Sequence, residues 1–176
     1  MGDLIILMGP TGSGKSSQGE LIARDLHGVH LSSGHLLREH PKTAPLMASG
    51  NLVPAEQVEE VVGEVIDGIA QSKPIVLDGF PRTQSNVHWI DHELLKHGRT
   101  LRRVILLDVK RDTIMERLKL RDRQDDGAEA IKRKWAAYER FTLPVVEHYR
   151  AMGLLTVVDG SGTFEEVRDR IEDVMR

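Results

Sequence analysis

The sequence contains no cysteine, which excludes disulfide bonds, thiolate catalysis and zinc sites built from cysteine. A chain without cysteine suits a reducing compartment, so we expect a cytoplasmic location. No apolar run approaches the roughly 20 residues that a membrane-spanning helix requires. An apolar segment begins at residue 4, so neither a secretory signal peptide nor a membrane anchor is expected.

Positive charge is not in excess, because 24 Lys and Arg residues stand against 27 Asp and Glu residues and give a net charge of −3. This balance argues against nucleic acid or an anionic membrane as a partner. Hydrophobic residues make up 40% of the chain and charged residues 29%, which is typical of a folded domain. A length of 176 residues predicts a single domain, residues 1–176, with a substantial core.

Five short apolar runs alternate with segments of helical periodicity. The runs cover residues 4–8, 29–31, 75–77, 104–109 and 154–158. They lack polar alternation, which is typical of strands in a sheet covered on both faces. The sequence therefore predicts a three-layer α/β fold with a central five-stranded parallel sheet. Ligands in such folds bind at the carboxyl ends of the strands.

Residues 9–16 read Gly-Pro-Thr-Gly-Ser-Gly-Lys-Ser and lie between the first apolar run and a helical segment. This order of strand, glycine-rich turn and helix is the context of a phosphate-binding loop. Backbone N–H groups of such a loop surround the phosphates, and Lys15 brings a full charge to them. A hydroxyl of Ser16 or Ser17 is expected to face a magnesium ion. The alternative, a glycine-rich turn with a stray lysine, leaves the full pattern and its flanks unexplained.

Asp78 follows the third apolar run and begins the segment Asp-Gly-Phe-Pro-Arg. A carboxylate at this edge of the sheet is suited to hold magnesium directly or through water. The alternative is a cap of a turn or helix. The sequence favours the magnesium role because the phosphate loop ends at the same sheet edge.

Cations gather on segments that should converge near this edge. They are Lys15, Arg38, Arg82, Arg117, Arg121, Arg123, Arg133 and Lys134. Any one of them could be an ordinary surface residue. Together, in an acidic chain, they indicate a site for two phosphate chains, because positioned cations stabilise the charge that spreads in phosphoryl transfer. The eight histidines, His30 among them, are interpreted as surface or packing residues.

Two segments read as insertions on this core, an arm at about residues 32–73 and a short lid at about residues 118–128. The arm should contain a longer helix that begins at Ala55. The lid is followed by a helix that should pause before Pro144, with Thr142 as its N-cap.

Three segments together resemble a known family. They are residues 75–82, Ile-Val-Leu-Asp-Gly-Phe-Pro-Arg, followed by Asn86; residues 31–38, Leu-Ser-Ser-Gly-His-Leu-Leu-Arg; and residues 50–54, Gly-Asn-Leu-Val-Pro. The chain resembles the adenylate kinases and their UMP/CMP kinase relatives over essentially its whole length. This resemblance implies the P-loop NTPase fold and reversible transfer of the terminal phosphate of Mg-ATP to a nucleoside monophosphate, with AMP favoured. It also implies a lid over the donor and an arm over the acceptor, whose closure excludes water.

The resemblance also implies roles for individual residues. Catalytic residues would be Lys15, Arg38, Arg82, Arg121, Arg123 and Lys134. ATP would be bound by Gly12, Ser13, Gly14, Lys15, Ser16, Ser17, Arg117, Arg121 and Gly162. The nucleoside monophosphate would be bound by Ser33, Arg38, Asn51, Leu52, Val53, Gly79, Phe80, Pro81, Arg82, Asn86, Arg123 and Lys134. Magnesium would be held by Ser16, Ser17 and Asp78, directly or through water.

The chain departs from the family at several positions. A serine follows Lys15 where the family has glycine, His35 replaces an acid, and Lys134 stands where an arginine is expected. Arg133 or Lys134 could face the site, and a lysine lacks the two-pronged grip of arginine on phosphate. The lid is too short for a metal-ligand set, so no zinc is expected.

Asn86 does not decide whether the acceptor is AMP or instead UMP or CMP, because an amide that rotates can bind the edge of either kind of base. Other phosphate-loop enzymes, such as a small-metabolite kinase or a tRNA prenyltransferase, would leave residues 78–82 unexplained. An inactive nucleotide-binding partner protein would be expected to lack some of the cations.

Overall fold

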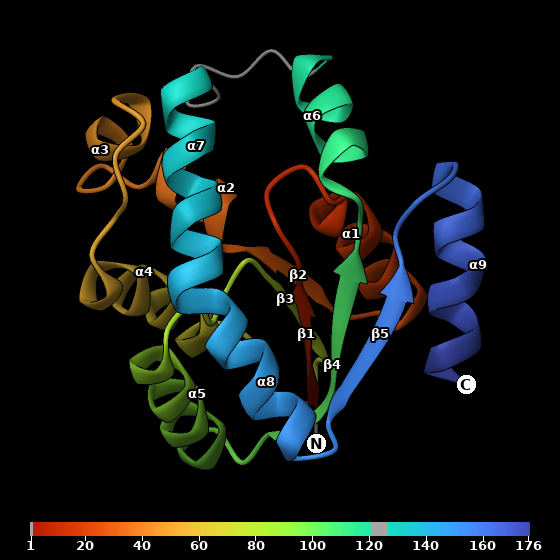
Figure 1. The fold of residues 1–176 in the computed structure, drawn as a ribbon. Helices are drawn as coiled ribbons and strands as arrows, with labels where there is room; N and C mark the ends of the chain where they lie inside the picture. The colour runs from red at the N-terminus through yellow and green to blue at the C-terminus, as the bar shows by residue number, and fades with distance from the viewer. Residues whose placement is uncertain (1, 121–126) are drawn as a thin grey trace.

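The computed structural model describes residues 2–120 and 127–176. Its centre is a five-stranded sheet with the strand order β2-β3-β1-β4-β5, and every neighbouring pair is parallel (Figure 1). The strands are β1 (Asp3–Met8), β2 (Val29–Ser32), β3 (Ile75–Asp78), β4 (Thr100–Asp108) and β5 (Leu155–Asp159). The predicted α/β fold with a five-stranded parallel sheet is confirmed.

One strand begins earlier than its apolar run suggested. β4 starts at Thr100, and its polar first residues pair with the start of β1. The register between the two strands shifts between Leu4 and Ile5, and Arg102 lies 3.7 Å from the carboxylate of Asp3. Backbone pairing thus extends the strand beyond its apolar segment, since a ladder does not require buried side chains.

Helices connect the strands and cover both faces of the sheet (Figure 1). They are α1 (Lys15–Asp25), α2 (Ser33–Glu39), α3 (Ala44–Ala48), α4 (Ala55–Asp67), α5 (Gln84–Lys96), α6 (Arg111–Lys119), α7 (Ala128–Ala137), α8 (Leu143–Ala151) and α9 (Phe164–Met175). α4 begins at Ala55, as predicted. Within the described ranges, no helix is both long enough and apolar enough to cross a bilayer.

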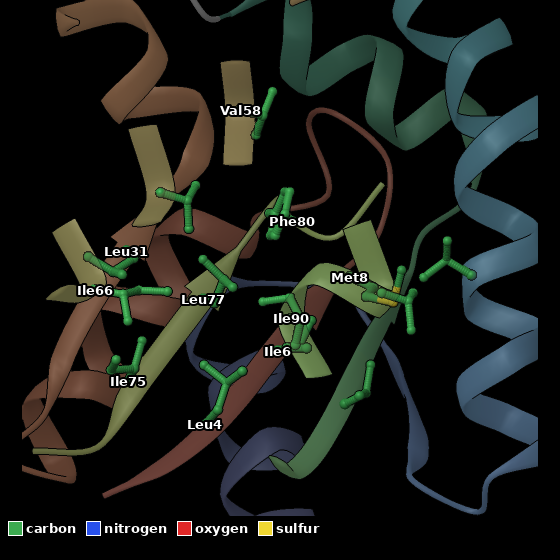
Figure 2. Close-up of a cluster of buried hydrophobic side chains, with 14 of the residues drawn as sticks. Leu4, Ile6, Met8, Leu31, Val58, Ile66, Ile75, Leu77, Phe80 and Ile90 are labelled. Carbon is green, nitrogen blue, oxygen red and sulfur yellow. The ribbon is translucent and has the colours of Figure 1, made fainter. Parts of the chain in front are cut away.

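The side chains of β1 alternate between two apolar clusters, because successive residues of a strand point to opposite faces. Leu4, Ile6 and Met8 pack with buried residues of α4, α5 and α8, and Figure 2 shows this cluster. Ile5 and Leu7 pack on the other face with residues of α1 and α9. All five are at most 3% exposed, so β1 lies at the centre of the three layers and fixes the position of the loop that follows it.

α7 and α8 are joined by a π-helical turn, η2 (Tyr138–Thr142). The predicted pause before Pro144 is confirmed in this form, and Thr142 holds the predicted N-cap position of α8, but its side chain makes no cap hydrogen bond. Thr142 has helical backbone angles, φ −92° and ψ −34°, whereas an N-cap residue is normally extended. Its hydroxyl instead donates to the carbonyl oxygen of Arg82, 3.2 Å away. The turn is therefore tied to the segment that follows β3.

Candidate active site

A cavity of about 520 Å³ opens at the carboxyl ends of β1 and β3. The phosphate loop, the arm and the α7–η2 segment form its walls. Five of the predicted cations line it: Lys15, Arg38, Arg82, Arg117 and Lys134. Arg121 and Arg123 lie outside the described residues, and their predicted roles remain predictions. In a chain of net charge −3, this hollow concentrates positive charge where the sheet topology favours a ligand.

The phosphate loop has the backbone form that its glycines allow. Gly12 and Gly14 have φ angles of +83° and +97°, which residues with a side chain rarely adopt. Gly14 is the N-cap of α1 and provides no side-chain cap, so the first N–H groups of the helix remain available to an anion. The Lys15 ammonium group donates to the carbonyl oxygen of Pro10 at 2.8 Å. The loop thus holds its lysine beside the expected position of the phosphates.

Asp78 is the last residue of β3 and is only 3% exposed. Burial by itself would raise the pKa of Asp78, but the interaction with His30, the charge of Lys15, and the hydroxyls of Ser16 and Ser32 together lower the pKa to about 2. The carboxylate is therefore ionised at neutral pH. Its Oδ2 atom is buried beside Nε2 of His30, and Asp78 also lines the cavity, so the ionised carboxylate borders the place where a ligand would bind.

His30 was interpreted as a surface or packing residue, and it is indeed partly buried, but its contact with Asp78 was not predicted. Its Nε2 atom lies 3.4 Å from Oδ2 of Asp78. In the parallel ladder, Ser32 is paired with Asp78 and His30 with Val76, so His30 lies diagonally next to Asp78 on one face of the sheet. A search for polar residues on the strand beside Asp78 would have found it.

Arg82 is the last residue of the segment Asp78–Arg82, and contacts within and next to this segment hold its side chain. Its Nε donates to the carbonyl oxygen of Gly79 at 2.6 Å, and its Nη2 lies 3.5 Å from the Ser33 hydroxyl. Arg38 lines the same part of the cavity from α2. Ser33 is fully buried and lies behind Arg82 instead of lining the cavity. Two guanidinium groups thus border the same cavity.

Arg117 connects the phosphate loop to the loop after β5. Its guanidinium group donates to the carbonyl oxygens of Ser13, Gly160 and Gly162 at 3.3, 3.0 and 3.3 Å. Ser13 and Gly162 therefore lie behind Arg117, and neither lines the cavity. The predicted stacking of Arg117 on the donor base remains a prediction.

The remaining predicted residues that the structure describes line the cavity. They are Gly12, Gly14, Ser16, Ser17, Asn51, Leu52, Val53, Asp78, Gly79, Phe80, Pro81 and Asn86. Of the two adjacent cations on α7, Lys134 lines the cavity, whereas Arg133 donates to the carbonyl oxygen of Gly50 in the arm. Tyr138 and Phe141 also line the cavity, and no binding role was predicted for either residue.

Asn86 is less adaptable than its sequence context suggested. Its Oδ1 accepts hydrogen bonds from the backbone N–H groups of Arg82 and Thr83 at 3.1 and 3.2 Å, and its Nδ2 donates to Glu59 at 2.7 Å. Thr83 and Asn86 form a reciprocal capping box at the start of α5. The expectation that this amide rotates freely is wrong.

A parallel sheet, a phosphate loop at the end of β1 and a cation-lined cavity define a phosphate-loop nucleotide-binding protein. Its family follows from comparison with known proteins. The family model for adenylate kinase matches residues 7–154. The adenylate kinase of Thermus thermophilus is 33% identical over 97% of this chain and 96% of the relative, and that of Prochlorococcus marinus is 32% identical over 99% and 100%. The adenylate kinase of Parvibaculum lavamentivorans is 34% identical over 97% of this chain and 91% of the relative. The chain belongs to the adenylate kinase family.

Proposed function

We propose that the chain is an adenylate kinase, which transfers the terminal phosphate of Mg-ATP reversibly to AMP and yields two ADP. The observation that carries this proposal is the convergence of Lys15, Arg38, Arg82, Arg117 and Lys134 on one cavity. Membership of the adenylate kinase family and the names of the full-length relatives support the same activity. Both substrates are intracellular nucleotides, which supports a cytoplasmic location.

The donor would occupy the phosphate-loop side of the cavity. The N-terminal end of α1 and the Lys15 ammonium group would bind its phosphates, because backbone N–H groups and a lysine favour concentrated negative charge. Arg117 borders this side and would contact the donor base. The hydrogen bonds that Arg117 makes to two loops would keep it in place while the donor enters.

The acceptor would occupy the side formed by the arm, with its phosphate on Arg38 and Arg82. An oxygen of this phosphate forms a bond to the terminal phosphorus of ATP, and the bond from that phosphorus to its bridging oxygen breaks. The acceptor phosphate is already ionised near neutral pH, so the step needs no general base. Lys134, and by resemblance Arg121 and Arg123, would stabilise the charge of the transferred group.

Asp78 and Ser16 fit a magnesium site. The ionised carboxylate of Asp78 lines the cavity together with Ser16, and the Ser16 hydroxyl interacts with that carboxylate. Magnesium bound with ATP would neutralise charge on the donor phosphates. Ser17 also lines the cavity but does not contribute to the lowered pKa of Asp78. We therefore propose that Ser16, and not Ser17, provides the hydroxyl that faces magnesium.

We also assign residues 32–73 to an arm that covers the acceptor and residues 118–128 to a short lid over the donor. Most of the lid lies outside the described residues. Val53 and Leu52 line the cavity from the arm, and they would shield the transferred group from water.

A coupled assay with Mg-ATP and AMP, UMP, CMP or GMP tests the proposal, with Lys15→Ala as the inactive control. We expect ADP formation to be fastest with AMP. Fastest turnover of UMP or CMP would assign the chain to the UMP/CMP kinase branch of the same class. ATP hydrolysis without transfer to any of the four would overturn the proposed function.

A further inference from the structure

The amide of Asn86 lies in the wall of the cavity, and its hydrogen bonds are directional. Two backbone N–H groups, those of Arg82 and Thr83, point at Oδ1. A carboxylate oxygen of Glu59 accepts from Nδ2. Rotation of the amide by half a turn would direct nitrogen at two donors and oxygen at a carboxylate, so three hydrogen bonds would be lost. The chemistry of its partners therefore fixes the orientation of the amide.

This orientation limits what Asn86 offers to a ligand. Both lone pairs of Oδ1 are engaged by backbone donors, and one N–H group of Nδ2 is engaged by Glu59. One N–H group of Nδ2 has no partner within residues 2–120 and 127–176, and the residue is only 2% exposed, at the cavity wall. Asn86 thus presents a single donor and no acceptor to a base that occupies the cavity.

Glu59 comes from the arm, whereas Asn86 comes from the helix after β3. On α4, Ala55 and Val58 line the cavity, and Glu59 lies on the same helix face because positions i, i+3 and i+4 are neighbours. The hydrogen bond of 2.7 Å thus joins the two sides of the acceptor wall. A bond to an ionised group is stronger than one between neutral groups, so Glu59 holds the nitrogen side of the amide firmly.

We propose that Glu59 is a positioning residue that sets base specificity at the acceptor site. It occupies one N–H group of Asn86, so the amide meets the base of the nucleoside monophosphate with one donor in one fixed place. A base is accepted when it brings a ring nitrogen or carbonyl oxygen to that donor. An exocyclic amine at the same place is rejected, because Asn86 has no free acceptor for it. This inference rests on the proposed function, since it assumes that the acceptor base lies against Asn86.

Removal of the carboxylate should loosen this selection. In Glu59→Ala, both N–H groups of Nδ2 face the wall without a partner, and the amide loses its only contact on the nitrogen side. The second N–H group can then serve a base whose acceptor atom lies at a different place, so more than one base arrangement finds a donor. We expect the KM for the preferred monophosphate to rise about tenfold, as the loss of a hydrogen bond to a charged group implies. The preference for that monophosphate over the other three should fall to a similar extent, while the KM for ATP changes less than about twofold.

Two further variants separate positioning from structural support. Glu59→Gln keeps an oxygen that accepts from Asn86, so it should restore most of the acceptor KM and of the base preference. Glu60→Ala is the matched control, because Glu60 lies next in sequence on α4 but pairs with Lys42. It should leave both quantities unchanged.

The experiment measures kcat and KM for ATP and for each of the four monophosphates in the native chain and the three variants. A rise in acceptor KM with loss of base preference in Glu59→Ala, restored in Glu59→Gln, supports the proposal. Equal rises in the KM values of ATP and acceptor, or an unchanged base preference in a folded Glu59→Ala, overturn it while the proposed kinase activity of the native chain stands. If Glu59→Ala does not fold, a base preference in Glu59→Gln that differs from the native one overturns the proposal, and an unchanged preference supports it. Absence of any monophosphate turnover by the native chain overturns both.

Discussion

Arg133 is hydrogen-bonded to Gly50 through two nitrogen atoms, with Nε and Nη2 lying 3.3 and 3.0 Å from the Gly50 carbonyl oxygen. The bond joins α7 to the turn between α3 and α4. The approach is close enough that a Cβ atom on Gly50 would lie 2.9 Å from Cβ of Ala130. The arm and α7 thus meet directly at this point.

Arg133→Ala should weaken acceptor binding more than donor binding, because it releases the arm that covers the acceptor. We expect the KM for AMP to rise about fivefold to tenfold, as the loss of a charge-assisted hydrogen bond implies, with a smaller change for ATP. Lys132→Ala is the matched control, since Lys132 is the exposed neighbour on the same helix. Equal KM values in the native chain and Arg133→Ala would show that the contact does not support arm closure.

Lys134 is the cation of α7 that lines the cavity, so its removal should slow transfer. We expect Lys134→Ala to lower kcat about a hundredfold, in the range observed when one stabilising donor of a transition state is deleted. Lys134→Arg should keep most of the activity, because a guanidinium group also binds phosphate and does so with two donors. Steady-state kinetics measures kcat in both variants. A native kcat in both would exclude Lys134 from the transfer step.

Lys15→Ala should abolish transfer without unfolding the protein. Its ammonium group donates hydrogen bonds to Pro10 and Ser13 of the phosphate loop, and the apolar core does not depend on these bonds. We expect kcat to fall at least about a thousandfold, because positioned charge is the main catalyst of phosphoryl transfer. Circular dichroism and thermal unfolding should match the native protein. Full activity in this variant would remove the proposed mechanism.

Asp78 should make folding stability dependent on pH under acidic conditions. The pKa of Asp78 is lowered in the folded protein from 3.8 to about 2, so the folded state favours the ionised form. This contribution is present above the unfolded pKa and is lost as the pH falls from about 4 to 2; the shift corresponds to about 2 kcal/mol. In Asp78→Asn, this part of the pH dependence should disappear.

Denaturant unfolding between pH 2 and 6 measures the effect. Asp173→Asn is the control, because Asp173 forms an exposed pair with Arg176 and should leave the pH profile native. Identical pH profiles for the native chain and Asp78→Asn would show that the pKa of Asp78 is not lowered by folding.

Local motifs made the fold and much of the site predictable. The phosphate loop, the segment from Asp78 to Arg82 and the start of α4 at Ala55 all have short-range signals, since glycine, proline and apolar runs act on their own neighbours. The convergence of cations on one cavity followed from the parallel topology, because such sheets bring the ends of their strands together.

Contacts between distant segments were not predictable in this way. The pairs of Arg133 with Gly50 and Glu59 with Asn86 join residues 83 and 27 positions apart, and no local pattern marks them. Helical spacing could not decide between Arg133 and Lys134 either, because adjacent residues lie about 100° apart and both border the same helix face. Thr142 makes no side-chain cap bond because the backbone stays helical there: residues before a proline usually end a helix, whereas here a widened turn accommodates the proline.

The π-helical turn η2 sets how α7 and α8 are rotated relative to each other. A π-helical turn contains one residue more than an α-helical turn and therefore rotates all later residues by about 100° around the axis. Upstream of η2, Lys134 lines the cavity; downstream, Val145, Val146 and Tyr149 are directed into the apolar interior. The extra residue allows α7 to face the cavity while α8 packs against the core. Deleting one residue within 138–142 should therefore misalign either α7 with the cavity or α8 with the core.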